Sequence, residues 1–295
     1  MLNELTFSLI FVLLYIGFGI LGKLKSIELV IKLSDVVVYV LIFSISLWAG
    51  SSVSFSDISS ILIYSILGST IVIIVTYSLG FLLNQKKEEI KLRRKDIASF
   101  QYRYGIPFVL GWIVGMGIRP ELSYGTLINI ELLFLASFLG YSTSKSISID
   151  VIRKSLSKGG LSLFLVVIGN LISGVILYII GLGNLKLDEI ISMGSGWYTF
   201  TGPLVSTYYS PYYGSIAFLI NFFREQFSYI LIPFLLKVKY SPYSAIAVGG
   251  ATSMDTTLPL YIGLLGDEYV ITAVFSGVTL TAVIPIILPL MLNLP

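Results

Sequence analysis

The chain has 295 residues, of which 56% are hydrophobic and only 12% are charged, and its formal net charge is +3. Soluble domains of this size carry about a quarter of their residues as Asp, Glu, Lys or Arg, so the composition excludes a water-soluble protein and predicts a helical membrane protein. Cysteine and histidine are both absent, which excludes disulfides, thiolate metal sites, His-ligated zinc and histidine bases.

Eight apolar runs follow one another along the chain, each suited to crossing the ~30 Å hydrocarbon core as a helix. They lie near residues 4–22, 30–50, 60–83, 104–119, 125–144, 160–182, 212–237 and 268–293. The first run has no basic segment before it and no small-residue cleavage site after it, so we expect a retained span rather than a signal peptide. The expected fold class is therefore all-α and polytopic.

Basic residues concentrate in the loops that follow the first, third and fifth of these spans. They are Lys23, Lys25 and Lys32, the stretch QKKEEIKLRRKDIASFQYR, and Lys145, Arg153, Lys154 and Lys158. The loops SSVSFSD and GIRPELSY between them carry one positive charge together. Because basic loops stay in the cytoplasm, we predict a multi-pass protein of the cytoplasmic membrane with its N-terminus outside.

Two further apolar segments, 190–210 and 241–264, are interrupted by Gly, Pro and hydroxyl residues. If 190–210 crossed the membrane, Lys237 and Lys239 would lie outside, against the positive-inside rule. If it enters and returns to the outer side, both lysines lie in the cytoplasm. We therefore predict two re-entrant hairpins, the first from outside and the second from the cytoplasm, with the C-terminus outside; ten full crossings are the alternative.

The sequence contains short internal repeats. IFVLLYIGFGILG resembles PFVLGWIVGMGI, VYVLIFSISLWAGSS resembles IELLFLASFLGYSTS, and the interrupted segments share MGSGWYTFTGPL and VGGATSMDTTLPL. We predict that residues 1–183 form two inverted three-helix repeats and that residues 184–295 form two hairpin-plus-helix repeats, the transport core. Inverted repeats that meet at broken helices are typical of secondary transporters, which bind their substrate near the bilayer midplane.

Two acidic residues lie deep in apolar surroundings. Asp255 stands in GGATSMDTTLP, within the second interrupted segment, and Glu225 lies near the middle of the span 212–237. Intramembrane acids usually face a pathway or a partner, so the pair suggests a cationic solute, a coupling proton or sodium, or both. The alternative is a buried ion pair of Arg224 and Glu225 with a partner elsewhere, which only stabilises packing. Glu131, about a turn and a half inside the outer end of the span 125–144, is close enough to that end for its side chain to extend to the outer interface, and a functional role is the alternative.

The backbone of a broken helix at membrane depth must be satisfied by protein or must line a water-filled cavity, so both interrupted segments are expected at the site. The predicted substrate- and ion-binding residues are Asp255, Glu225, Thr252, Ser253, Thr256, Thr257, Asn221, Arg224, Trp197, Tyr198, Thr199 and Thr201.

The run GGATSMDTTLP, the upstream GSGWYTFTGP and the Arg-Glu pair between them resemble the LysO-type lysine exporters. These motifs cover roughly residues 190–260, and the six preceding spans agree in number and charge pattern. The resemblance implies export of L-lysine and its analogues across the cytoplasmic membrane by proton antiport. It also implies that Glu225 and Asp255 are the functional intramembrane acids.

Other classes fit less well. An intramembrane aspartyl protease needs a GxGD motif, and the nearest match, GLLGDEY, lies at a membrane edge; a lipid-linked transferase would show Asp-rich motifs. We therefore expect no enzyme activity, cofactor, metal or nucleic-acid partner. The expected partners are lysine, the bilayer and a coupling proton or sodium ion, and a homo-oligomer stays open. The runner-up is a sodium-coupled carrier of small organic anions, for which Arg224 is the one candidate ligand.

Overall fold

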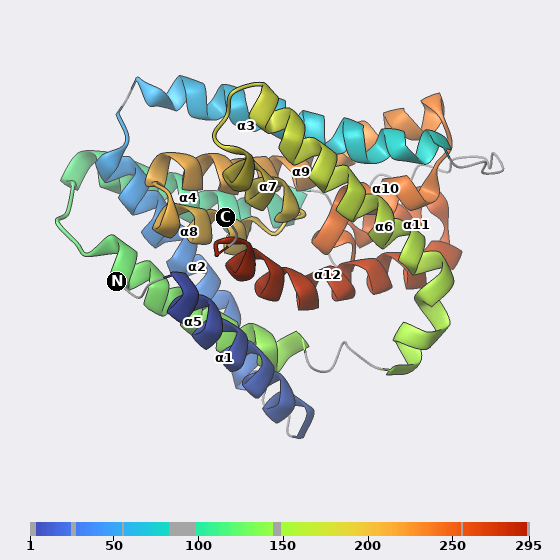
Figure 1. The fold of residues 1–295 in the computed structure, drawn as a ribbon, viewed down its shortest axis with the longest axis horizontal. Coiled ribbons are helices and arrows are strands. Elements are labelled where there is room, and N and C mark those ends of the chain that lie inside the picture. The colour runs from blue at the N-terminus through green and yellow to red at the C-terminus, as the bar shows by residue number, and fades with distance from the viewer. Residues whose placement is uncertain are drawn as a thin grey trace.

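The computed structural model describes residues 4–24, 28–54, 56–82, 98–143, 149–254 and 256–293, and all regular structure in these ranges is helical (Figure 1). The long helices are α1 (Glu4–Leu24), α2 (Glu28–Ser52), α3 (Asp57–Ser78), α4 (Ala98–Ile118), α5 (Tyr124–Thr143), α6 (Ile149–Ile179), α9 (Pro211–Val238) and α12 (Val270–Met291). Each contains one of the predicted apolar runs or most of it. The all-α prediction is therefore confirmed for the described residues.

Short helices occupy the two interrupted segments. They are α7 (Leu185–Met193) and α8 (Tyr198–Tyr208) in the first, and α10 (Pro242–Gly249), η2 (Gly250–Met254) and α11 (Leu258–Leu265) in the second. Two further 3-10 turns, η1 (Leu79–Leu82) and η3 (Asp267–Tyr269), follow α3 and precede α12. Both segments are thus broken helices, as their Gly, Pro and hydroxyl residues indicated.

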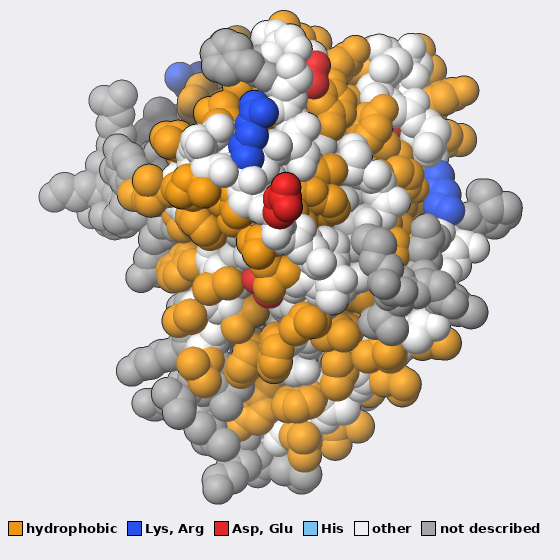
Figure 2. All heavy atoms as spheres, turned by 90° about the vertical axis from the view of Figure 1, so that its left-hand side faces the viewer, with side chains coloured by type: hydrophobic (Ala, Val, Ile, Leu, Met, Phe, Trp, Pro, Cys, Tyr) orange, Lys and Arg blue, Asp and Glu red, His pale blue; other side chains and the backbone are white. Residues whose placement is uncertain are grey.

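The surface agrees with a lipid environment. Within the described ranges, three helical stretches have the length and composition to cross a membrane: Asp57–Leu82, Gly159–Ile179 and Val270–Met291. Large apolar side chains are exposed along the helices, for example Leu13 at 69% and Phe234 at 65%. Figure 2 shows broad hydrophobic areas and few charged side chains on one face. In water such areas would be unfavourable, whereas acyl chains cover them at no cost.

The relative directions of α3 and α6 follow from two contacts. A Cβ on Gly169 of α6 would meet Thr76 near the end of α3, and Leu177 lies against Gly68, eight residues earlier in α3. As the α6 residue number rises, the α3 residue number therefore falls. The two helices are antiparallel, so α6 ends beside the first half of α3.

Helix α9 runs in the same direction as α3. Near their beginnings, the Tyr212 hydroxyl donates to Ser60 Oγ (3.3 Å); near their ends, the Tyr77 hydroxyl donates to the Lys239 carbonyl (2.7 Å). The end of α6 and the start of α9 consequently lie at the same end of α3. The chain between them, which contains α7 and α8, leaves from and returns to that end.

The second broken segment also returns to the end from which it starts. Tyr243, at the start of α10, packs edge-on against Tyr269, just before α12, with ring centroids 5.9 Å apart. The Ser162 hydroxyl, in the first half of α6, donates to the Tyr243 carbonyl (3.1 Å). In Figure 1, α10 and α11 lie toward the right, where α3 and α9 end, and α8 lies toward the left.

Candidate functional site

Each broken helix is interrupted by residues with left-handed backbone. Helix α7 ends before Ser195 (φ 53°) and Gly196 (φ 86°), and α10 ends at Gly250 (φ 60°). Glycine adopts this conformation without the steric cost that a Cβ imposes, which favours Gly196 and Gly250 at these positions, whereas Ser195 adopts it despite its Cβ. The break leaves helix ends, with their incompletely bonded backbone groups, inside the protein.

The two breaks touch each other. The Ala251 N–H donates to the Ser195 carbonyl (2.9 Å), and a Cβ on Gly250 would collide with that same carbonyl. A Cβ on Gly196 would lie 3.2 Å from the Gly249 carbonyl. The approach of the two backbones therefore requires glycine at these positions, and it brings together segments about fifty residues apart in the sequence.

Arg224 holds the second break. Its guanidinium donates from Nε to the Val248 carbonyl (2.7 Å), from Nη2 to the Ala247 carbonyl (3.1 Å) and from Nη1 to Asn170 Oδ1 (2.8 Å). The side chain is 1% exposed. A cation at this place stabilises the carboxyl end of α10, where backbone carbonyls carry partial negative charge. The ion-pair interpretation of Arg224 finds no acid among its partners in the described chain.

Two buried asparagines hold the first break. Asn221 Oδ1 accepts from the Gly196 N–H (2.7 Å), and its Nδ2 donates to the Ile191 carbonyl (2.9 Å). Asn170, on α6, donates from Nδ2 to Ser195 Oγ (2.7 Å) while its Oδ1 accepts from Arg224. We call Asn170, Ser195, Gly196, Asn221, Arg224 and Ala251 the tip junction, since these six residues connect both breaks.

The hydroxyl groups that were predicted as ligands in the second break hydrogen-bond mainly to backbone carbonyls of the same segment. Thr252 donates to the Gly249 carbonyl (2.9 Å), Ser253 to the Gly250 and Ala273 carbonyls (2.8 and 2.9 Å), and Thr257 to the Thr252 carbonyl (3.0 Å). The Thr256 carbonyl accepts from the Tyr229 hydroxyl on α9. Each hydroxyl oxygen keeps lone pairs after donating its hydrogen, so these side chains remain able to accept from an ammonium group.

Glu225 follows Arg224 on α9 and lies one turn after Asn221, so it is at the level of the tip junction. Its side chain is 2% exposed, and Oε1 accepts from Gln226 Nε2 (3.0 Å). Asp255 lies outside the described residues, between Met254 and Thr256.

The four predicted residues at the start of α8 are mainly packed against protein. Tyr198 meets the rings of Phe218 and Phe222 edge-on, both at 5.3 Å, and Thr201 donates to the Trp197 carbonyl (2.9 Å). Tyr198, Thr199 and Thr201 are buried, whereas Trp197 is partly exposed. Of this group, Trp197 therefore has the side-chain surface left to meet a solute.

Sequence reasoning missed Asn170, Ser195 and Tyr229. Asn170 had a usable signal, since it is the one amide side chain in the apolar run 160–182. Ser195 and Tyr229 had none, because serine and tyrosine are common in membrane helices and both act through contacts with distant segments.

Glu131 does not extend to the interface, so that expectation is wrong. It is 8% exposed, and its Oε1 accepts from the Ser44 hydroxyl of α2 (2.8 Å). The hydrogen bond connects α5 to α2 within the helix bundle and keeps the carboxyl away from water.

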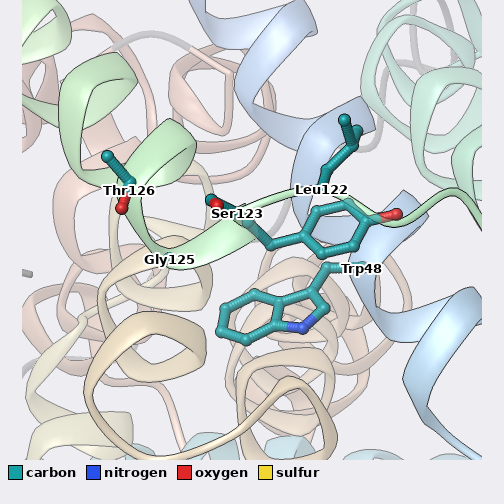
Figure 3. Close-up of a pocket in the computed structure, with 6 residues that line it drawn as sticks. Trp48, Leu122, Ser123, Gly125 and Thr126 are labelled. Atoms are coloured by element: carbon teal, nitrogen blue, oxygen red, sulfur yellow. The ribbon is translucent and has the colours of Figure 1, made fainter.

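A separate pocket of about 270 Å³ lies where α2 meets the start of α5 (Figure 3). Its lining consists of Trp48, Leu122, Ser123, Tyr124, Gly125 and Thr126. The Trp48 and Tyr124 rings stack at 5.9 Å. None of these lining residues is charged, so the pocket does not suit a cationic solute, and stacked aromatic rings near a helix end are typical of the membrane interface.

Comparison with known proteins decides the family. The sequence profile described as "Lysine exporter LysO" matches residues 106–292, which include every residue of the tip junction. The chain belongs to the LysO lysine exporter family. This confirms the resemblance seen in the sequence and identifies the protein as an integral membrane transporter.

Two relatives of this lysine exporter family illustrate the match. "Lysine exporter LysO" of Escherichia coli K12 is 27% identical over 300 residues, covering 95% of this chain and 96% of its own. A Haemophilus influenzae protein, provisionally named a lysine exporter, is 28% identical over 191 residues, covering 64% of this chain and 95% of its own. No solved structure matches the chain. The relatives are named as exporters, which are not enzymes.

Proposed function

We propose that this protein exports L-lysine and its analogues across the cytoplasmic membrane by proton antiport. The observation that carries the proposal is the meeting of two broken helices at a polar junction, with the buried acid Glu225 at the same level of α9. Membership in the lysine exporter family supports lysine as the substrate.

We propose that the two broken segments are re-entrant hairpins, from outside for α7–α8 and from the cytoplasm for α10–α11. The directions of α3, α6 and α9 support this, because each broken segment leaves from and returns to the same end of α3. The edge-on packing of Tyr243 against Tyr269 supports it for the second segment. With eight crossings, both chain ends lie outside and Lys237 lies inside.

The division into repeats, 1–183 and 184–295, is supported by matching helix pairs. If α1–α3 and α4–α6 are inverted copies of each other, the packing of α2 against α4 should be matched by packing of α5 against α1. Both contacts are present. If α9 and α12 also correspond to each other, the packing of α3 against α9 should be matched by packing of α6 against α12. Both of these contacts are present as well. A pseudo-two-fold axis in the membrane plane would place the tip junction near the midplane.

The junction suits a solute with the charges of lysine. The N-termini of α8 and α11 begin at the two breaks and favour a negative group such as the α-carboxylate. Glu225 and, from the sequence, Asp255 would receive the ammonium groups, and the hydroxyls of Thr252 and Thr257 would accept from them. A partly exposed Trp197 would cover the aliphatic chain.

Coupling would arise by competition between lysine and protons for the same carboxylates. With the site open to the cytoplasm, ionised acids would attract lysine, which carries a net charge of about +1 at neutral pH. With the site open to the more acidic exterior, protonation would remove that attraction and lysine would leave. Return of the protonated site to the inside would complete the cycle without any other titrating group.

The anion-carrier alternative depended on Arg224 as a ligand. Its guanidinium already donates to three neutral acceptors of the protein, from Nε, Nη1 and Nη2, which leaves it poorly placed to meet a free anion. Among the residues that the structure describes, no observation favours that second function.

The test is efflux from proteoliposomes loaded with labelled lysine. We expect efflux to accelerate when the outer solution is made acidic and to be unaffected by an imposed sodium gradient. Acceleration by sodium alone would replace the proton with sodium as coupling ion. Absence of efflux under both gradients would contradict lysine export.

A further inference from the structure

A site for a cationic solute contains an arginine directly beside one of its proposed acids. Arg224 and Glu225 are neighbours on α9, and both are buried. An arginine that turned toward Glu225 would neutralise it and repel lysine. The protein therefore needs a means of keeping the two side chains apart. Successive residues of a helix point in different directions. A long arginine side chain can nevertheless turn toward its neighbour unless its guanidinium is held in place.

The described contacts supply this means. The Arg224 guanidinium points to the α10 carboxyl end and to Asn170, and Glu225 accepts instead from the neutral amide of Gln226 (3.0 Å). Asn170 is fully buried on α6. Its amide oxygen accepts from Arg224 (2.8 Å), its amide nitrogen donates to Ser195 (2.7 Å), and its backbone carbonyl accepts from Ser192 (2.7 Å).

We propose that Asn170 is a positioning residue for lysine recognition: it holds the Arg224 guanidinium on α10 and thereby keeps this cation away from Glu225, one of the acids proposed to receive the solute. This inference rests on the proposed function. Asn170 has no contact with the solute in this scheme and acts through Arg224.

The chemistry of the asparagine side chain explains why it suits this position. The amide accepts from the arginine on one side and donates to the Ser195 hydroxyl on the other, so one residue joins both breaks. Removal of the acceptor leaves Nη1 of a buried guanidinium without its partner, which is costly unless the cation finds another acceptor. The carboxylate of the next residue is the acceptor with the greatest attraction for it.

The experiment measures lysine affinity of the purified full-length protein by calorimetry, together with its melting temperature without lysine. Asn170→Leu removes the acceptor, whereas Asn170→Asp keeps an acceptor for Arg224. The double variant Asn170→Leu/Arg224→Gln removes the released cation and keeps a neutral donor for the α10 carbonyls. Ser162→Ala is the matched control, because it removes another α6 hydrogen bond to the second hairpin, at Tyr243 rather than at the tips.

We expect Asn170→Leu to raise the lysine Kd by about tenfold or more, the usual scale for losing one charge interaction. Asn170→Asp should stay within about threefold of the original Kd, and the double variant should bind lysine more tightly than Asn170→Leu alone. Ser162→Ala should lower the melting temperature without changing the Kd. If Asn170 only stabilised the fold, the double variant would instead bind lysine more weakly than Asn170→Leu.

Three results would overturn the inference: an unchanged Kd in Asn170→Leu, equal losses in the Leu and Asp variants, or a double variant weaker than the single one. If Asn170→Leu does not accumulate, Asn170→Asp decides, since loss of lysine binding there contradicts the positioning role. Failure of the unsubstituted protein to bind lysine would instead overturn the proposed function itself.

Discussion

Arg224 and Glu225, which are neighbours on α9, have different hydrogen-bond partners. Arg224 is committed to carbonyl and amide oxygens of other elements, whereas Glu225 accepts from the amide of the next residue. An Arg-Glu pair in an apolar span also suggested a buried ion pair with a partner elsewhere in the bundle, and the described contacts of Arg224 include no acid. At the scale of the residue, the acid is therefore the candidate for recognising a cation.

Replacing Glu225 by Gln tests that candidate, since it keeps the shape and removes the charge. We expect lysine efflux from proteoliposomes to fall to the level of protein-free vesicles, with the amount of folded protein in the membrane little changed. Glu131→Gln is the matched control, because its amide can still accept from Ser44, and it should export normally. Normal export by Glu225→Gln would remove Glu225 from the site.

Asp255 is the second acid that the sequence assigns to lysine. Asp255→Asn should abolish lysine binding measured by calorimetry, because one of the two negative charges is lost, and Asp255→Glu should impair it by adding a methylene among glycines. An unchanged affinity in Asp255→Asn would show that the carboxylate has no direct contact with lysine.

At the scale of the element, the decisive feature is a helix that stops inside the bundle. Helices α7 and α10 end where glycine backbone turns left-handed, and the two ends then share a hydrogen bond. This contact needs small residues on both sides, which explains the glycine content of both segments.

Gly250→Ala should disrupt this contact. The added Cβ is strained at φ 60° and collides with the Ser195 carbonyl, and left-handed strain alone costs about 1–3 kcal/mol. We expect a lower melting temperature of the detergent-purified protein and weaker lysine binding. Gly17→Ala and Gly117→Ala are controls, since a Cβ at either position meets no neighbour and favours the helix. Equal effects at all three positions would contradict a special role for the break.

At the scale of the whole molecule, the arrangement of α3, α6 and α9 supports the proposed topology. Because α9 is parallel to α3 and α6 is antiparallel to it, an even number of crossings separates α6 from α9. The proposed hairpin satisfies this condition because the chain then makes no crossing between α6 and α9. Ten full crossings would require each broken segment to cross once, which is an odd number.

Single-cysteine labelling tests the topology, and the absence of native cysteine makes each reporter unambiguous. Tyr240 is only 8% exposed, so the exposed Lys237 is the better reporter at that end. A cysteine at Lys237 should react only from the cytoplasmic side, and one at Tyr209 only from outside. Labelling of Lys237→Cys from outside would contradict the hairpins and favour ten crossings.

Hydropathy alone placed the long helices of the described residues and the two segments that break, because each of these depends on residues close together in the sequence. It did not fix every boundary, since α6 begins at Ile149, eleven residues before the predicted run 160–182. Asp255 and Glu225 were likewise visible as acids in apolar surroundings. Only the tertiary structure decided which groups Glu225 and its neighbours meet. Arg224 bonds carbonyls more than twenty residues away and an asparagine 54 residues away, and Glu131 meets a serine 87 residues away. Such partners are chosen by the packing of whole helices, since a buried polar group bonds whatever acceptor the fold brings within reach.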